Sequence, residues 1–326
     1  MTFDSPVVGG GIRTVFQWFL AFIITSGPLF NQEVSAASGT NSFEFLRLSP
    51  EARASGLSEV VVANTQGTEA VFFNPSGLPA TRGSELEAQH LSYVSDVSYD
   101  YASFARGDGR RGWGVNLGYL RVGNFTRTVY DPTSVDRFDE TGDIPVHDLL
   151  FSVGYGYSPS VLWDFGLAAK FFQETLDAST VNGGALDIGG IYHFDPQWSL
   201  GASVRDIGPS LRFAGAEARL PWTGDVGLWN KLNAWLGWGA EVSETIDEPI
   251  ELRAGGEAIP ESHIALRAGY ALRSESNDLG MLANASFGMG LLIGPAHLDY
   301  AFGSLGDFGY THRISMAWRF TETPLK

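Results

Sequence analysis

Six histidines and the carboxylates near them are the residues of this 326-residue chain that could perform acid–base chemistry. His297 and Asp299 would share one face of a strand, and His193 stands two residues before Asp195. A hydrolase would need a serine, a histidine and an orienting polar group to converge, and no such grouping is evident. We therefore predict no catalytic site. The histidines are His90, His147, His193, His263, His297 and His312.

Metal ligands are equally sparse. The chain has no cysteine, which excludes disulfides and thiolate metal sites. Residues 131–143 carry several carboxylates, whose oxygens suit calcium, but their spacing does not match an EF-hand loop. We expect a solvated external loop there, and we predict neither a metal nor a cofactor. The acids are Asp131, Asp136, Asp139, Glu140 and Asp143.

A short turn motif, Asn74-Pro75-Ser76-Gly77, is the first candidate functional element. The ring of Pro75 fixes its φ, and Gly77 permits a positive φ, so the motif predicts a rigid, well-defined turn. It could act as a moving part of a plug. Turn chemistry alone favours a structural role in stabilising that plug.

Charged residues of both signs fall on one face of the expected strands. They could line a path for ions or substrates. Buried charges are usually paired, so we favour cross-strand pairs that brace a wall and hold a plug. Glu251 and Arg253 on one strand, beside Arg267 on the next, suggest such a ladder. The set is Asp164, Lys170, Asp187, Arg205, Glu251, Arg253, Glu257, Arg267, Asp299 and Arg313.

The elements that would position these residues are β-strands, because the sequence alternates with period two from about residue 84. In residues 113–119, Trp113, Leu117 and Tyr119 share a face opposite Gly114 and Asn116. Bulky side chains on one face and small or charged ones on the other fit lipid outside and a crowded lumen inside. The tryptophans and tyrosines near strand ends fit aromatic girdles at the membrane surfaces.

Fourteen strands are predicted, and their connections alternate in length. Connections after even-numbered strands are tight, whereas residues 122–146, 175–184, 206–220 and 274–280 form longer loops. Short turns on one rim and long loops on the other are typical of outer-membrane barrels with both termini in the periplasm. The predicted strands are 84–94, 97–106, 112–121, 147–157, 163–174, 185–194, 198–205, 221–228, 232–242, 250–259, 264–272, 281–292, 296–302 and 310–320.

The chain divides into four predicted parts. Residues 1–36 read as a cleaved export signal, because an apolar run follows Arg13 and small residues follow it. Residues 37–83 break the strand rhythm and could form a hatch inside the barrel. Residues 84–320 form the transmembrane antiparallel β-barrel, and residues 321–326 form a tail. A net charge of −16 makes nucleic acid an improbable partner.

The hatch segment resembles the start of the PorV/PorQ family, relatives of the FadL-type fatty-acid channels. Three further stretches are similar to the same family, two in the last hairpin and one in the middle of the chain. The sequence departs from the pattern at Pro50-Glu51, at residues 64–67 and in the tail after Phe320. The matching residues are Phe45-Leu46, Ala52-Arg53, Gly56, Asn74-Pro75-Ser76-Gly77-Leu78, residues 200–208, residues 298–302 and residues 311–315.

This resemblance implies an integral outer-membrane barrel in contact with lipid, with two possible roles. The first is docking of exported proteins or components of a type IX secretion system. The second is passage of hydrophobic small molecules such as fatty acids, as in FadL-type channels, which release them laterally from a hatch-occluded lumen. We place secretion slightly ahead and an open porin third. An apolar pocket by the hatch and a gap in the wall would favour the second role. A continuous wall around an ion-paired lumen would disfavour it.

Overall fold

The computed structural model describes residues 43–123, 125–133, 137–213, 215–261, 263–273, 284–306 and 309–320. The predicted export signal and the tail lie outside these residues. So do residues 37–42 of the predicted hatch. Among the described residues, no helix is long and apolar enough to cross a membrane.

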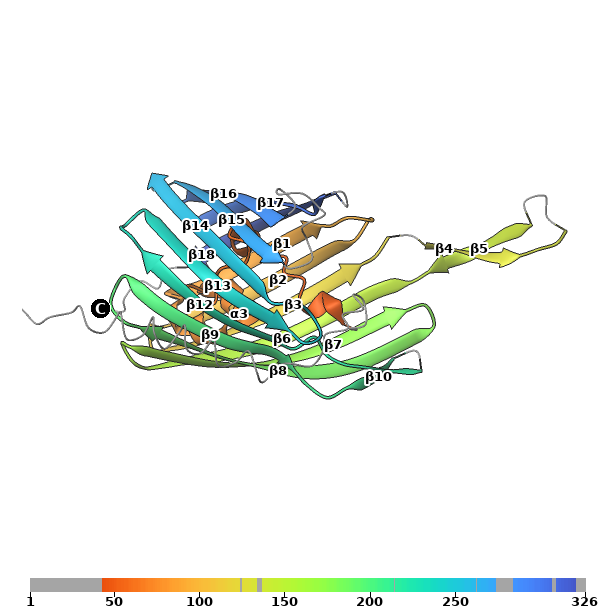
Figure 1. Cartoon of the computed structure of the whole chain (residues 1–326), viewed down its shortest axis with the longest axis horizontal. Coiled ribbons are helices and arrows are strands. Elements are labelled where there is room, and N and C mark those ends of the chain that lie inside the picture. The colour runs from red at the N-terminus through yellow and green to blue at the C-terminus, as the bar shows by residue number, and fades with distance from the viewer. Residues whose placement is uncertain are drawn as a thin grey trace, which may run out of the picture. The chain divides into compact units, whose positions relative to one another are not determined.

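The fold is a closed antiparallel barrel of fourteen strands, as the sequence predicted (Figure 1). Pairing of β1 with β18 closes it, and each strand is hydrogen-bonded to both neighbours. The barrel strands are β1 (Gly83–Ser92), β2 (Ser98–Gly107), β3 (Arg111–Arg121), β6 (Val146–Ser160), β7 (Trp163–Leu176), β8 (Ser179–His193), β9 (Trp198–Ile207), β12 (Thr223–Lys231), β13 (Leu236–Thr245), β14 (Glu251–Glu261), β15 (Ile264–Arg273), β16 (Ala285–Ile293), β17 (Ala296–Ser304) and β18 (Tyr310–Phe320).

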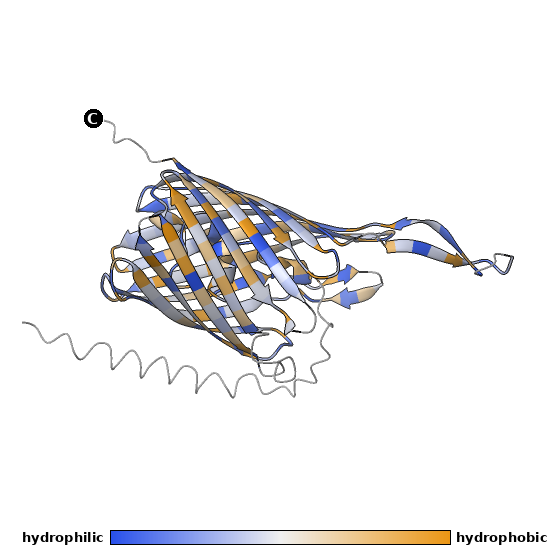
Figure 2. Ribbon diagram, turned by 90° about the horizontal axis from the view of Figure 1, so that it is seen from above, coloured by the Kyte–Doolittle hydropathy of each residue, from blue (hydrophilic) through white to orange (hydrophobic). Residues whose placement is uncertain are grey.

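The outer face of the barrel is apolar and the inner face is small or charged. On β3, Trp113 and Leu117 are 45% and 56% exposed, whereas Asn116 between them is buried. Trp318 on β18 is also outward and exposed, and apolar and polar residues alternate along the strands in Figure 2. This is the arrangement of a barrel whose outer wall meets hydrocarbon. Trp229 is an exception, because its side chain is buried inside the barrel.

The two rims of the barrel differ in their connections. One rim has only short turns, such as residues 161–162 and 294–295, and we call it the short-turn rim. The opposite, long-loop rim carries two extra hairpins that the sequence analysis treated as loop. They are β4 (Phe125–Tyr130) with β5 (Phe138–Ile144), and β10 (Leu211–Phe213) with β11 (Ala216–Ala218). The first hairpin projects far from the barrel (Figure 1).

Two predicted connections are wrong. Residues 175–184 are not a long loop, because β7 and β8 continue until only residues 177–178 separate them. Asp177 has a φ of 55°, which suits a tight turn. Residues 229–231 are not a turn either, since β12 runs to Lys231 and the turn follows at 232–235. In the first place polar and glycine residues continue the two strands, and in the second the buried Trp229 belongs to β12.

Residues 43–81 lie inside the barrel and form the hatch. They contain only short elements, and their apolar side chains are almost all buried against the inner wall. The elements are η1 (Glu44–Leu46), α2 (Ala52–Gly56), η2 (Gly67–Glu69), α3 (Ala70–Phe73) and η3 (Pro75–Ala80).

Candidate functional site

Glycines on the inner wall make room for the backbone of the hatch. A Cβ added to Gly166 of β7 would lie 2.1 Å from the amide nitrogen of Ser76, and one added to Gly201 of β9 would lie 2.3 Å from the carbonyl oxygen of Val62. No other residue allows the two backbones to approach this closely. Other wall glycines approach hatch residues between Gly56 and Thr81 in the same way. Among the described glycines, none approaches residues 43–55. The small inner face predicted from the sequence therefore matches the path of the hatch.

Asn74 fixes the turn of the predicted motif. Its Nδ2 donates to the carbonyl oxygen of Val62 at 2.8 Å, and its Oδ1 accepts from the backbone N–H and hydroxyl of Ser76 at 3.2 and 2.6 Å. Pro75 begins η3, where its missing N–H costs nothing. The prediction that Gly77 is needed for a positive φ is wrong, because its φ is not positive. A Cβ there would lie 2.3 Å from the carbonyl oxygen of Thr65.

The inward charges near β7 to β12 hold the aromatic core of the hatch. Lys170 is fully buried between Asp187 at 3.0 Å and Asp206 at 2.7 Å. Arg205 binds Asp225 at 3.0 Å. The Lys170 ammonium also lies 5.5 Å from the ring centre of Phe72 in α3, within cation–π range. Wall and hatch thus share one buried electrostatic cluster.

A second cluster joins β14, β15 and β17 to α2. Arg267 binds Glu257 at 2.7 Å and also contacts Asp299. Arg53 of the hatch binds the same Glu257 at 3.2 Å and Glu69 of η2 at 2.6 Å. Breaking such a pair would leave a buried charge without a partner, so this cluster anchors the hatch firmly.

The predicted ladder of Glu251, Arg253 and Arg267 is only partly present. Glu251 binds Arg253 at 2.7 Å and Arg273 at 2.7 Å. Arg267 lies opposite Glu257 in the strand register, too far along β15 to join them. The period-two pattern gave the correct face for each residue but could not give the register. Arg313 of β18 donates to the carbonyl oxygen of Ser49 at 2.8 Å and to Thr311 at 3.0 Å.

The buried hatch acid Glu51 is another residue that the sequence analysis missed. It accepts a hydrogen bond from Gln89 Nε2 at 2.7 Å and is 2% exposed. Burial raises the pKa of Glu51 well above its usual value, and the nearby Glu87 and Glu69 add to the rise. Arg53, by contrast, has its pKa raised by Glu257 and Glu69 in spite of its burial. Loss of the proton from Glu51 is therefore harder in the folded barrel than from a free carboxyl group.

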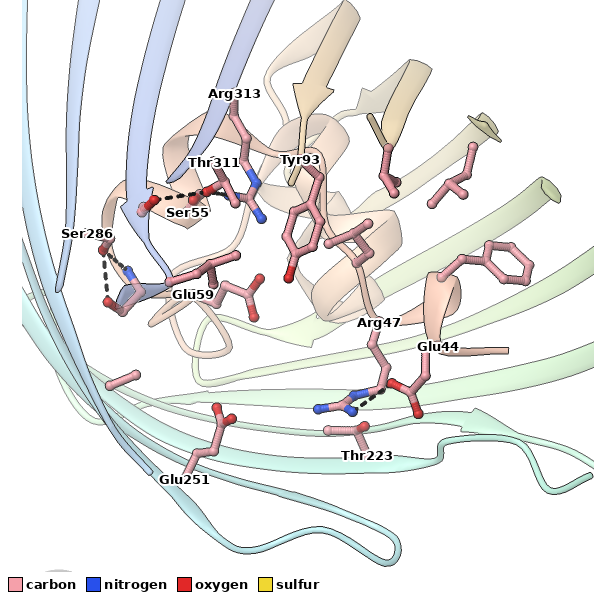
Figure 3. A pocket seen from close by; sticks show the side chains of 18 of the residues that line it. Glu44, Arg47, Ser55, Glu59, Tyr93, Thr223, Glu251, Ser286, Thr311 and Arg313 are labelled. Atoms are coloured by element: carbon pink, nitrogen blue, oxygen red, sulfur yellow. Dashed lines mark hydrogen bonds and ion pairs between the residues drawn. The ribbon is translucent and has the colours of Figure 1, made fainter. Parts of the chain in front are cut away.

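A cavity of about 710 Å³ lies between the first hatch residues and the long-loop rim. Figure 3 shows Glu59 and Tyr93 directed into the space bounded by Arg47, Glu251 and Arg313. One side of the cavity is mainly apolar and belongs to β3, β6, β7, η1 and the connection between β1 and β2. The other side is charged and belongs to β9 and β14 to β18. The apolar lining includes Phe43, Phe45, Leu48, Val97, Leu120, Val122, Val146 and Leu176.

The histidines make different contacts from those suggested by the sequence. His193 Nε2 lies 2.7 Å from Asp164 rather than beside Asp195, whose carboxylate accepts from the backbone of the turn at residues 197–198. His90 Nδ1 lies 2.7 Å from Asp100 on the outer face. No group of three or more potential ligands within the described ranges could hold a metal ion.

Asp148 and Glu174 also line the cavity and were missed. Asp148 lies within a predicted strand, on the same face as Ser152 and Gly154, and that parity was the signal that could have identified it. Glu174 lies opposite Asp148 on the neighbouring strand. This pairing could not be predicted, because the sequence does not specify how neighbouring strands align.

Comparison with known proteins supports the fold. No protein-family model and no curated protein matches the sequence. A mutant of the TodX monoaromatic hydrocarbon channel matches with a TM-score of 0.61 and 12% identity over 82% of this chain and 98% of that one. The toluene transporter TodX of Pseudomonas putida matches with a TM-score of 0.58 and 13% identity, over 83% of this chain and 96% of that one. A Pseudomonas aeruginosa FadL homologue matches with a TM-score of 0.55 and 11% identity, over 83% of this chain and 98% of that one. The chain is thus similar in fold to these three proteins, a monoaromatic hydrocarbon channel, a toluene transporter and a FadL homologue.

Proposed function

We propose that this chain is an outer-membrane channel that binds hydrophobic small molecules in the cavity at the long-loop rim and passes them across the barrel. The observation that carries the proposal is that cavity, about 710 Å³ in volume and apolar along one side. Its volume falls within the usual range of small-molecule sites, roughly 300–1,000 Å³. Structures with the same fold are named as channels for toluene and other monoaromatic hydrocarbons, which supports this role over docking of exported proteins. The secretion role has no specific support from the comparisons.

We place the long-loop rim outside the cell and the short-turn rim, with both ends of the barrel, in the periplasm. Short turns face the periplasm in bacterial outer-membrane barrels. The aromatic residues on the outer face would then sit at the two membrane surfaces. In this orientation the cavity is open to molecules that arrive from outside.

Entry and passage are separate steps in this proposal. The described strands pair all round the barrel, with a register shift between Leu186 and Ile188 where β8 meets β9, and we infer no lateral release. The hatch from residue 56 onward fills the lumen beneath the cavity, in contact with the wall glycines. A bound molecule therefore crosses only when this part of the hatch shifts. Binding needs no such shift.

Uptake of toluene by proteoliposomes or by cells that express the chain tests the proposal. Ala271 lines the cavity from β15 and is 6% exposed, so Ala271→Trp would fill part of the space. We expect this variant to lose most uptake. Leu117→Trp on the outer face of β3, where Leu117 is 56% exposed, is the matched control and should transport normally. Equal uptake by wild type, both variants and empty membranes would refute the proposed function.

A further inference from the structure

Two acids face each other across neighbouring strands at the cavity. Asp148 of β6 and Glu174 of β7 are directly paired in the strand register, and both line the cavity. Like charges directly opposite on a sheet repel each other. Replacing one of the two acids with a neutral residue would make the barrel more stable, unless a positively charged group binds between them.

The described part of the chain supplies no such charge. Within the described ranges, no ion pair joins Asp148 or Glu174 to a lysine, arginine or histidine. Every other acid that lines the cavity is paired with an arginine: Glu44 with Arg47 at 3.0 Å, Glu59 with Arg253 at 3.3 Å, and Glu251 with Arg253 at 2.7 Å. The two carboxylates are therefore exceptional in this cavity.

Asp148 is also incompletely hydrogen-bonded although it is buried. It is 7% exposed and accepts from the backbone N–H of Thr175, but its Oδ1 has no hydrogen-bond partner. Glu174 accepts only from the backbone N–H of Phe43. The phenol of Tyr99 on β2 lies within electrostatic range of Asp148, and its fully buried Oη has no partner either. A buried polar atom without a partner calls for a ligand or another explanation.

We propose that this wall of the cavity binds the ammonium group of an amphipathic amine. A primary ammonium has three N–H donors, enough for Asp148 Oδ1 and the Glu174 carboxylate, which both line the cavity. The apolar residues Leu120 and Leu176 on the same side would cover the hydrocarbon body of the molecule. The inference deepens the proposed function, and rests on it, because it names the class of molecule that the rim admits.

Binding of three probes that share one hydrocarbon body tests the inference: 4-phenylbutylamine, 4-phenylbutanol and 4-phenylbutyrate. Isothermal titration calorimetry on the full barrel in neutral detergent at neutral pH gives each affinity. Charge-assisted hydrogen bonds from a desolvated ammonium predict about 10- to 100-fold tighter binding of the amine than of the alcohol. The butyrate should bind most weakly. Equal affinities for amine and alcohol would overturn the inference.

Removing the two charges should remove this preference. In Asp148→Asn/Glu174→Gln the ratio of amine to alcohol affinity should fall towards one. Asp139→Asn/Glu140→Gln on the exposed β5 hairpin makes the same change of charge far from the cavity and should keep the wild-type ratio. If the double variant does not fold, the same affinity ratio is measured on Glu174→Gln alone, because Glu174 is partly exposed. A wild-type ratio in either Glu174 variant would contradict the assignment.

The results also separate this inference from the proposed function. Amine preference without toluene uptake by the wild-type chain would support the ammonium site and defeat passage. Toluene uptake without amine preference would defeat the ammonium site and leave the channel role standing.

Discussion

The two parts of the hatch are held in the barrel by different forces. We call residues 43–50 the leading segment and residues 51–81 the seat. The leading segment packs through side chains beside the cavity, and its Arg47 binds Glu44 at 3.0 Å and also contacts Glu248 between β13 and β14, while 21% of the arginine side chain remains exposed. The seat lies with its backbone on wall glycines and is joined to the wall by buried ion pairs. Entry into the cavity should therefore disturb the leading segment and the few seat residues that line the cavity, such as Glu59, whereas passage should require a shift of the whole seat.

Matched arginine substitutions in the two parts should lower the free energy of unfolding by very different amounts. Arg53→Met in the seat leaves Glu69 and Glu257 buried without their cation, which predicts a loss of about 3–5 kcal/mol in the free energy of unfolding. Arg47→Met in the leading segment removes two partly exposed pairs, with Glu44 and Glu248, and should cost less than about 1 kcal/mol. Denaturant unfolding of the purified barrels measures both. Equal losses would remove the distinction between the two parts.

Contact between the seat and the wall glycines can be tested with one methyl group. Gly166→Ala places a Cβ 2.1 Å from the Ser76 nitrogen, so it should cost about 1–3 kcal/mol and raise the steady conductance in planar bilayers as the seat loosens. Gly190→Ala on the neighbouring strand β8 meets its closest atom at 3.5 Å and should change stability by less than about 0.5 kcal/mol. Indistinguishable alanine variants would show that the close backbone contact is dispensable.

Glu51 at the start of the seat should make stability depend on pH. Its pKa is raised in the folded barrel by burial, so its contribution to stability is complete below the ordinary carboxyl value of 4.5 and is lost as pH rises through the raised value. Glu51→Gln keeps the acceptor for Gln89 and has no proton to lose. The variant should match wild type at low pH and become the more stable of the two at higher pH. A constant difference in melting temperature across the pH range would contradict this.

The barrel could be predicted from the sequence because apolar residues alternate with small or polar residues along each strand, which shows the outward and inward faces of that strand. Trp113 and Asn116, for example, were placed on the correct faces without any partner strand. Strand ends were predicted less well where polar and glycine residues continue a strand. Beyond Thr175 and before Gly184, polar and glycine residues looked like loop but continue β7 and β8.

The candidate site was harder to predict because it depends on register. Glu251 and Arg253 are two residues apart on one strand, so their pairing was accessible from the sequence. The pairing of Arg267 with Glu257, and the opposition of Asp148 and Glu174, depend on how strands align across the barrel. The position of the hatch is also long-range: Gly77 is required by the approach of Thr65, not by its own φ.

A reversible covalent lock on the seat tests the division between entry and passage most directly. The hydroxyls of Ser58 in the seat and Ser286 on β16 are 2.8 Å apart, and the chain has no cysteine of its own. In Ser58→Cys/Ser286→Cys, oxidation should abolish toluene uptake while toluene binding in the cavity persists, and reduction should restore uptake. Each single variant controls for the loss of the serine hydroxyl. Undiminished uptake by the oxidised double variant would contradict the account, because molecules would then cross the barrel without any shift of the seat.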